Sequence, residues 1–433
     1  MALLLRNAHL VDPLTGIDQV SDMLIRDGHI VEVGPSLPDP PKGIVKDLSG
    51  KYLVPGLVDC HVHFRDPGYE YKETVETGMR AAAKGGFTGV VPMANTNPVI
   101  DDGSKIAALI EKAAYDPGRT KVYPLGACTK NIEGKELAEM GDMVAKGALA
   151  FSDDGRGIQD GSMMRKVMDY AKMFGKPVLS HCQMEDLSAG GVVNEGIAST
   201  RLGLSGWPAV AEEVQIDRDI LLAQLTGCHI HIQHITTAAG AEMIRRAKEE
   251  GIPVSAEVTP HHLFLNEECI DGAVYDTNFK MNPPLRTKED NEALIQALLD
   301  GTIDMISTDH APHAPHEKAL EFDLAPFGIT GLETALGLVL TNLVNTGRMT
   351  WQQLVERMAI APRELLGLEQ VRFEPGSVAD LTVIDPNVEW TVKEDEFESK
   401  SRNSAFIGVQ LKGRATDVYT EGYASLEDGK VTF

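Results

Sequence analysis

The stretch LVDCHVHF, residues 57–64, is followed by TVETGMRAAAKGG, residues 74–86, and then by FTGVVPMAN, residues 87–95. The first and third stretches are short and rich in apolar residues, which is typical of buried strands. The middle stretch repeats its apolar residues with the period of a helix. A strand, a helix and a second strand in this order predict two parallel strands joined by a helical crossover.

The same alternation continues to residue 367. Six further strand candidates follow, separated mainly by helical segments: VYPLGACT (122–129), ALAFSDDG (148–155), PVLSHC (177–182), HIHIQHIT (229–236), PVSAEVTPHHL (253–263) and DMISTDHAPH (304–313). Eight strand–helix units predict an α/β protein with a closed (β/α)8 barrel of the TIM type. A doubly wound open sheet is the alternative, but it calls for a glycine-rich phosphate turn after the first strand, and FRDPG stands there instead.

The two ends of the chain have a different pattern. Residues 1–55 and 368–433 contain short runs rich in β-branched residues, split by Gly, Pro and Asp turns. Neither end can bury a large core alone. We therefore expect residues 1–55 and 368–433 to pair into a small accessory β-sandwich domain, and residues 56–367 to form the barrel.

Composition narrows the function. The 433 residues include 40 Lys and Arg against 64 Asp and Glu, a net charge of −24 with neutral histidine. Nucleic-acid binding needs clustered basic residues, so this balance argues against it. An acidic chain also repels an anionic substrate, so any site for one must be locally positive.

The five cysteines are widely spread and contain no C-x-x-C pair. This usage argues against a disulfide framework and favours a reducing compartment. The apolar N-terminal run ends at Arg6, too early for a signal peptide, and no run of about 18 apolar residues occurs. We expect a cytoplasmic protein that does not bind membranes.

Polar residues gather where the predicted strands end. His61 and His63 have the i, i+2 spacing that puts both side chains on one face of a strand. Barrel enzymes build their active sites at the carboxyl ends of the strands. Imidazoles and carboxylates meeting there predict a metal site with enough ligands for two divalent ions. The candidate ligands are His61, His63, Asp153, His181, His234 and Asp309.

Two of these choices stay open on periodicity alone. In HIHIQHIT, His231 shares the inward parity of the strand, whereas His234 breaks it. In SDDG, Asp153 and Asp154 compete in the same way. The pair His261 and His262 is interpreted as mouth or supporting material rather than as ligands.

Two motifs carry a family resemblance. DCHVHFRDPG (59–68) and STDHAPHAPHEK (307–318), which contains D-x-A-P-H-x4-K, resemble the two signatures of dihydroorotases in the amidohydrolase superfamily. The likeness extends through GFTGVVPMANTNP, FSDDG, SHCQ, HIQHITT, EVTPHHL, KMNPPLR and APFGITGLETAL. The likeness covers essentially the whole chain, and among dihydroorotases the chain is most similar to the bacterial type I enzymes. The resemblance implies reversible conversion of N-carbamoyl-L-aspartate into L-dihydroorotate and water, during de novo pyrimidine synthesis.

The resemblance also implies the ligand set. His61, His63 and Asp309 would bind one zinc ion, His181 and His234 a second, and Asp153 would bridge the two. By this analogy, His234 is preferred to His231 and Asp153 to Asp154. Asp309 would also act as general base and general acid. Many relatives bridge their metals with a carboxylated lysine on the fourth strand, but GALAFSDDG (147–155) has no lysine.

The substrate residues implied by the family are Arg65 and Asn95 for the carboxylate, assisted by His313. Asn282 and the backbone around Phe327 and Gly328 would contact the ring amide, next to His63. A homodimer is the expected assembly, and an association with aspartate transcarbamoylase stays open as a further partner.

Two other functions remain as alternatives. One is a dihydropyrimidinase-like or allantoinase-like cyclic amidase. It is disfavoured by the missing lysine on the fourth strand and by the presence of Arg65 with Asn95. The other is a non-catalytic homologue that scaffolds aspartate transcarbamoylase, which should have lost metal ligands.

Overall fold

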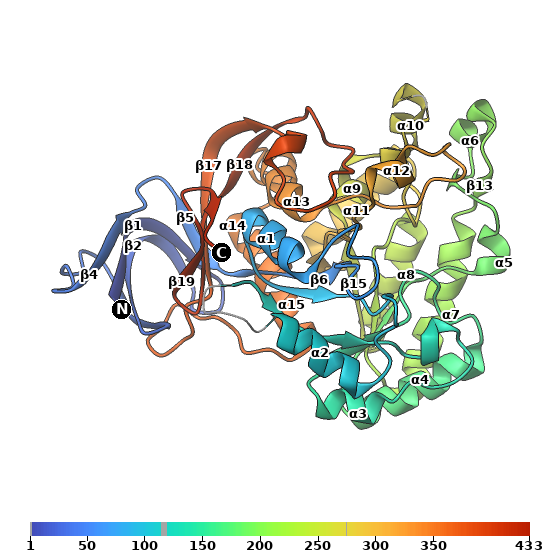
Figure 1. The fold of residues 1–433 in the computed structure, drawn as a ribbon, viewed down its shortest axis with the longest axis horizontal. Coiled ribbons are helices and arrows are strands. Elements are labelled where there is room, and N and C mark those ends of the chain that lie inside the picture. Colours follow the sequence, from blue (N-terminus) through green and yellow to red (C-terminus); the bar gives the residue numbers. More distant parts are fainter. Residues whose placement is uncertain (1, 114–118, 274) are drawn as a thin grey trace.

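The computed structural model describes residues 2–113, 119–273 and 275–433, and its centre is a barrel of parallel strands (Figure 1). All eight predicted strand positions contain strand structure. The third is interrupted at Tyr123 and Pro124, so that it forms two short strands. The barrel strands are β6 (Leu57–Val62), β7 (Phe87–Pro92), β8 (Lys121–Val122), β9 (Leu125–Gly126), β10 (Ala150–Ser152), β11 (Val178–Ser180), β14 (Ile230–Ile232), β15 (Val254–Val258) and β16 (Met305–Ile306).

The strands pair in chain order around the barrel. One run of hydrogen-bonded strands extends from β9 through β10, β11, β14 and β15 to β16, and another links β6, β7 and β8. All these pairs are parallel. A parallel bridge between Val62 and His310 joins the last strand region to the first. The predicted closed barrel is therefore confirmed.

A helix follows each strand position. The outer helices are α1 (Val75–Gly85), α2 (Gly103–Ala113), α3 (Met140–Ala145), α4 (Gly161–Met173), α7 (Val210–Thr226), α8 (Ala238–Glu249), α11 (Lys288–Asp300) and α13 (Leu332–Val339). Their ends follow ordinary capping rules. At the start of α1 the side chain of Thr74 accepts a hydrogen bond from the Thr77 N–H, and at its end Gly86 has φ 99°, a conformation that favours glycine.

Shorter elements lie between these units. They are α5 (Glu185–Ser188), β12 (Val193–Asn194), α6 (Ile197–Leu202), β13 (Gly206–Trp207), α9 (Pro260–Phe264), α10 (Glu267–Ala273), α12 (Pro315–Lys318), α14 (Trp351–Val355) and α15 (Ala361–Leu366). Among the described residues, no helix is both long and apolar enough to cross a membrane.

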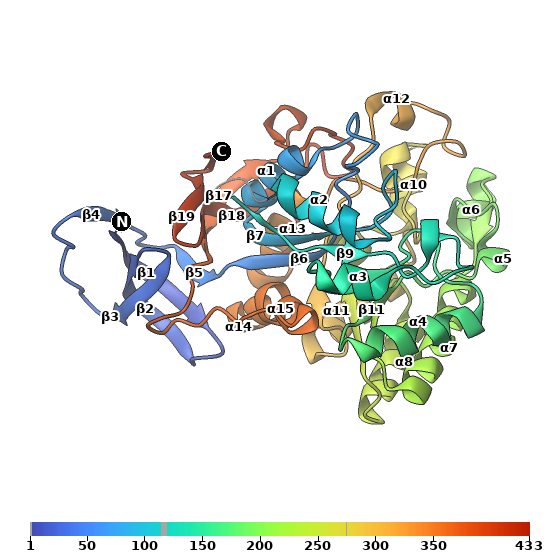
Figure 2. The same ribbon diagram turned by 60° about the horizontal axis from the view of Figure 1, so that its bottom comes forward.

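Both chain ends contribute to one nine-stranded sheet beside the barrel (Figures 1 and 2). Its strands are β1 (Ala2–Asp12), β2 (Ile17–Arg26), β3 (His29–Gly34), β4 (Gly43–Asp47), β5 (Tyr52–Pro55), β17 (Leu381–Thr391), β18 (Gln410–Thr420), β19 (Tyr423–Glu427) and β20 (Lys430–Val431). The antiparallel pairing of β5 with β17 joins the N-terminal and C-terminal parts. This sheet is the predicted terminal β-sandwich, and the division of the chain at residues 55 and 368 stays a prediction.

The sheet has its own apolar core, separate from that of the barrel. Leu5, Leu10 and Met23 from its N-terminal strands pack with Leu381 and Val383 of β17. The barrel core is larger and contains the apolar faces of its strands and covering helices. The carboxyl ends of the strands around this barrel core carry the polar residues described next.

All five cysteines are free thiols, and four of them are buried.

Candidate metal centre and substrate pocket

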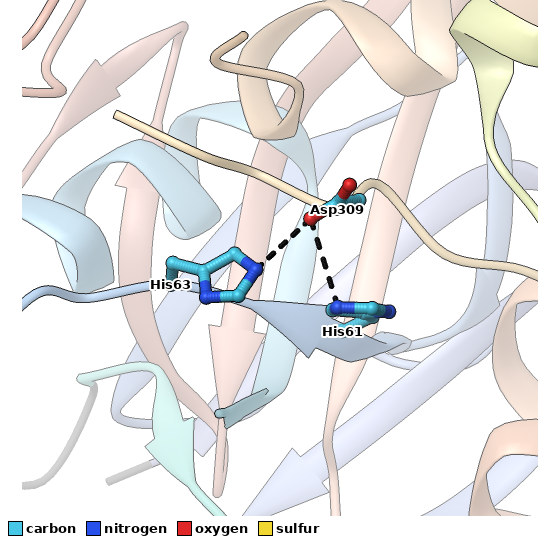
Figure 3. Close-up of side chains that lie close together, drawn as sticks. All are labelled: His61, His63 and Asp309. Carbon is cyan, nitrogen blue, oxygen red and sulfur yellow. Dashed lines mark hydrogen bonds and ion pairs between the residues drawn. The ribbon is translucent and has the colours of Figure 1, made fainter. Parts of the chain in front are cut away.

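Three candidate ligands from the two ends of the barrel sequence meet at one point (Figure 3). His61 lies in β6, His63 follows that strand, and Asp309 follows β16. The Oδ1 atom of Asp309 is 3.0 Å from His63 Nε2 and 3.6 Å from His61 Nε2. The parallel bridge at Val62 brings these two segments together, which explains why residues about 250 positions apart share a site.

A second carboxylate, that of Asp154, lies among all four histidines. Its Oδ1 is 3.3 Å from His61 Nε2, 3.5 Å from His181 Nδ1 and 3.8 Å from His234 Nε2, and its Oδ2 is 3.5 Å from His63 Nε2. Burial opposes ionisation, but His61 and the other imidazoles lower the pKa of Asp154 well below its ordinary value. Asp154 therefore has the position expected for a ligand shared by two ions.

The prediction of Asp153 at this position does not fit the structure. The strand β10 ends at Ser152, and the Asp153 carboxylate turns back toward the preceding strand. It accepts hydrogen bonds from the backbone N–H groups of Cys128 and Thr129, at 2.8 and 3.0 Å, and from the Thr129 hydroxyl. Burial raises the pKa of Asp153 to about 6. Asp153 ties two strand ends together, and Asp154 replaces it as the candidate bridging ligand.

Backbone conformation explains how His234 enters the site. The strand β14 ends at Ile232, and His234 has φ 31°, in the left-handed region. This turn brings the His234 ring to the Asp154 side, although its parity in the strand is outward. Arg65 and Asp309 also have positive φ, 58° and 47°. Such conformations in non-glycine residues are uncommon and tend to cluster at functional sites.

His231, which strand alternation favours over His234 as a ligand, points into the barrel but lies deeper than the metal-type cluster. Its Nε2 is 3.2 Å from Glu257 Oε2, and its Nδ1 is 2.8 Å from the Ser255 hydroxyl. The other oxygen of Glu257, Oε1, is 2.6 Å from His61 Nδ1. Glu257 is the penultimate residue of β15 and is fully buried. It was missed by the sequence analysis, although an acidic residue inside an otherwise apolar strand is an available signal.

The donor set fits divalent metal ions. Two groups of three residues each bring their ligand atoms within 4.8 Å of one another. The first group is His61, His63 and Asp309, and the second is His61, Asp154 and His234. His61 Nε2, His234 Nδ1 and Asp154 Oδ1 are buried and have no hydrogen-bond partner among the described residues. Buried polar atoms are rarely left without partners, so these atoms require another ligand. Imidazole and carboxylate donors match zinc and similar ions.

A pocket of about 110 Å³ opens above the cluster. It is lined by His63, Arg65, Asp154, Gly155, His181, His234, Asn282, Asp309, Ala311, Phe327 and Gly328. Every predicted substrate residue lies in this wall or touches it. A small ligand in this pocket would contact both the histidine cluster and Arg65.

Arg65 supplies a guanidinium without a carboxylate partner. Its Nε donates to the carbonyl of Pro312 at 3.3 Å, and its Nη2 is 3.4 Å from His313 Nε2. In the part of the chain that the structure describes, no carboxylate oxygen lies within 4.0 Å of this group. A half-buried, unpaired guanidinium in a pocket suits an anionic ligand, because it can bind a carboxylate through two hydrogen bonds.

Asn95 and His313 stand next to the lining residues. Asn95 Oδ1 is 3.0 Å from His63 Nδ1, and its Nδ2 donates to Asp154 Oδ2 at 3.2 Å. His313 Nε2 is 2.8 Å from the carbonyl of Phe327. Asn95 thus orients two candidate ligands as well as bordering the pocket, which is a contact that the sequence did not reveal.

Asn282 presents an amide at the other side of the pocket. Its buried Oδ1 has no hydrogen-bond partner among the described residues, and its Nδ2 lies 3.5 Å from Gln183 Oε1. Gln183 in turn contacts His181 Nε2 at 2.9 Å. A free amide oxygen beside a metal-type cluster suits an N–H donor such as that of a cyclic amide.

His261 and His262 do not join the cluster. They lie in α9 with their ring centroids 4.4 Å apart, and both are buried. His262 contacts the Thr259 hydroxyl and the carbonyl of Pro283, at 2.8 and 2.9 Å. His262 thus links α9 to the loop at Pro283, and the interpretation of the pair as mouth or supporting residues stays a prediction.

The comparisons with known proteins agree with this geometry. A family model described as dihydro-orotase-like matches residues 50–239. A dihydroorotase of Pelotomaculum thermopropionicum is 49% identical over 428 residues, which cover 99% of this chain and 99% of the relative. A dihydroorotase of Ruminiclostridium cellulolyticum is 48% identical and covers 96% of each chain. The chain belongs to the dihydroorotase family.

Solved structures place the dihydroorotase fold among other cyclic amidases. The L-hydantoinase (dihydropyrimidinase) from Arthrobacter aurescens matches with a TM-score of 0.88 at 26% identity, covering 100% of this chain and 97% of the other. The D-hydantoinase (dihydropyrimidinase) from Thermus sp. matches with a TM-score of 0.86 at 26% identity, covering 99% and 96%. Both dihydroorotase and hydantoinase relatives indicate a cyclic amide hydrolase with a TIM-type barrel.

Proposed function

We propose that this dihydroorotase interconverts N-carbamoyl-L-aspartate and L-dihydroorotate in de novo pyrimidine synthesis. The observation that carries this substrate is the unpaired guanidinium of Arg65 in the wall of a pocket whose floor is a histidine and carboxylate cluster. A neutral cyclic amide gives no reason to place an unpaired cation in the pocket wall. A ring that carries a carboxylate does.

The proposal includes two zinc ions per chain. His61, His63 and Asp309 would hold one ion, and His181 and His234 the other. Asp154 would bridge them, in the role first assigned to Asp153. The buried atoms without hydrogen-bond partners support this arrangement. When bound, such ions supply a water of lowered pKa and polarise the carbonyl that is attacked.

Arg65 would fix the substrate by its carboxylate, with Asn95 and His313 beside it. Asn282 would accept a hydrogen bond from the ring N–H, and the backbone at Phe327 and Gly328 would border the ring. Held at these points, the ring carbonyl faces the carboxylate of Asp309. This fixed orientation replaces much of the entropy cost of bringing the reacting groups together.

Asp309 would carry the proton. In ring opening it accepts a proton from the attacking water and returns it to the ring nitrogen as the amide C–N bond breaks. In ring closure it removes a proton from the ureido nitrogen, which attacks the side-chain carboxyl carbon. Asp309 then returns that proton to the departing hydroxyl group, and the C–O bond breaks to release water. The Nε2 of His63, 3.0 Å from Asp309 Oδ1, keeps the carboxylate directed into the pocket.

A substrate comparison tests the proposal. The purified chain should hydrolyse dihydroorotate much faster than dihydrouracil or allantoin. Both alternatives are neutral rings and gain nothing from Arg65. Faster turnover of either neutral ring would instead support a dihydropyrimidinase-like or allantoinase-like activity. Absence of both metal and activity would support the scaffolding role.

Assembly and location belong to the same proposal. A homodimer, an association with aspartate transcarbamoylase and a cytoplasmic location are implied by the family resemblance, and the five free thiols suit a reducing compartment. Sedimentation of the chain alone, and mixed with a transcarbamoylase, tests both assemblies.

A further inference from the structure

The final lysine of the signature D-x-A-P-H-x4-K has no part in the site described so far. Lys318 ends α12, and its Nζ donates to the carbonyl oxygens of Pro326 and Gly328, at 3.0 and 3.1 Å. Gly328 lines the substrate pocket. The Lys318 ammonium therefore lies directly behind the pocket wall.

A second lysine holds the preceding part of the same wall. Lys280 donates from Nζ to the carbonyls of Asp323 and Ala325, at 3.0 and 2.7 Å. The same atom lies 4.5 Å from the centre of the Phe327 ring. Lys280 is only 2% exposed. Together the two lysines bind four carbonyl groups between residues 323 and 328.

Neither ammonium is paired with a carboxylate. Within the described chain, no carboxylate oxygen lies within 4.0 Å of Lys318 or Lys280. Glu317, adjacent to Lys318 in the sequence, pairs instead with Lys72 at 2.8 Å. A cation removed from water without an opposite charge is costly, so two of them in one wall indicate a role beyond packing.

We propose that Lys318 and Lys280 form a cationic clamp that positions the wall of residues 323–328 and supplies positive charge to the anionic substrate. The inference rests on the proposed function. The chain's net charge of −24 repels a substrate with one or two carboxylates, so the pocket must be locally positive. The two lysines supply part of that positive charge. Arg65 would bind the substrate directly, and the two lysines would act from behind the wall as positioning residues.

The charge of Lys318 is sensitive to pH near neutrality. Burial, and then the charge of Lys280, lower the pKa of Lys318 to about 7. The charged and titratable groups that face this region are Lys280, His313, Asp276, Glu317 and Asp323. Because a lysine loses its charge as pH rises through its pKa, the clamp weakens above neutral pH. Bound substrate, being anionic, would oppose this loss.

The test compares KM and kcat for dihydroorotate in wild type, Lys318→Gln and Lys318→Arg between pH 6.5 and 8.5. Lys166→Met, on the exposed face of α4, removes a positive charge elsewhere and serves as the control. At an effective dielectric constant of about 20, the loss of one nearby charge should raise KM about tenfold. We expect kcat to change by less than about threefold, since the lysines do not touch the reacting atoms.

The pH profile separates a charge effect from a structural one. Wild-type KM should rise with pH, Lys318→Gln should have a high and flat KM, and Lys318→Arg should keep a low KM at pH 8.5. If Lys318→Gln retains the wild-type KM and its pH dependence, the clamp is wrong. A flat KM in wild type alone also overturns it, even if the variants do not fold. If wild type does not hydrolyse dihydroorotate, the proposed function itself fails.

Discussion

The Nδ1 atom of His61 lies 2.6 Å from Oε1 of Glu257, and both side chains are fully buried inside the barrel. The second oxygen of Glu257 contacts His231, so the carboxylate joins a candidate ligand to the layer beneath the site. Burial opposes the charge on Glu257, but His61 and His231 lower its pKa. This contact fixes the His61 ring with Nε2 toward Asp154 and Asp309, as carboxylates commonly do for metal-bound histidines.

Replacing Glu257 by Gln should weaken metal binding. The amide oxygen can still accept a hydrogen bond from His61 Nδ1, but it carries no charge, so the ring loses basicity and is held less firmly. Loss of such a contact commonly costs about 10- to 100-fold in metal affinity. Competition with a chromophoric chelator measures this directly. Glu242→Gln, on the exposed surface of α8, is the matched control and should bind metal as wild type does. Unchanged affinity in Glu257→Gln would remove Glu257 from this role.

Replacing the two neighbouring aspartates should have different effects, on metal binding for Asp154 and on stability for Asp153. Asp154→Ala removes the carboxylate shared by four histidines, so we expect loss of metal and near loss of turnover. Asp153→Ala leaves the buried N–H groups of Cys128 and Thr129 without an acceptor, and its free energy of unfolding should fall by about 2 kcal/mol. Metal analysis and urea unfolding of both variants check this. Metal loss in Asp153→Ala alone would restore the original assignment.

Arg65→Met should raise KM for dihydroorotate by about 10- to 100-fold, because a charge-assisted hydrogen-bond pair to the carboxylate is lost. Arg65→Lys keeps the positive charge but cannot form two parallel hydrogen bonds to the carboxylate, so its KM should lie between those of wild type and Arg65→Met. Arg165→Met, an exposed arginine of α4, controls for the change in net charge. Steady-state kinetics at one pH suffice. Equal KM values in Arg65→Met and Arg165→Met would show that the substrate carboxylate binds elsewhere.

Asp309→Asn should separate binding from proton transfer. Asparagine keeps an oxygen near His61 and His63 but cannot accept and return a proton, so kcat should fall by about a thousandfold. KM for dihydroorotate should stay within about threefold of wild type. Metal content must be measured on the same sample, since Asp309 is also a candidate ligand. Substantial turnover by a metal-loaded Asp309→Asn protein would exclude it as the proton carrier.

The sequence predicts the barrel well because strand and helix periods alternate eight times, and each apolar run needs cover on both faces. It also predicts that polar residues gather at the carboxyl ends of the strands, where the structure brings His61, His63 and Asp309 together. It could not choose Asp154, because β10 ends at Ser152, two residues earlier, and parity has no meaning beyond a strand end. His234 was selected only by resemblance, since its left-handed backbone reverses the direction that alternation predicts. Glu257 could not be assigned from the sequence, because its role depends on the contact with His61, which lies on another strand of the barrel.

Dihydroorotate turnover measured against metal occupancy in one sample decides whether this chain is a metal-dependent dihydroorotase. The metal should be removed with a chelator and zinc returned in steps, with occupancy and rate recorded at each step. We expect no turnover without metal, recovery of turnover in step with zinc, and saturation near two ions per chain. Turnover that persists after the metal is gone, or full zinc occupancy without any dihydroorotate hydrolysis, would contradict it.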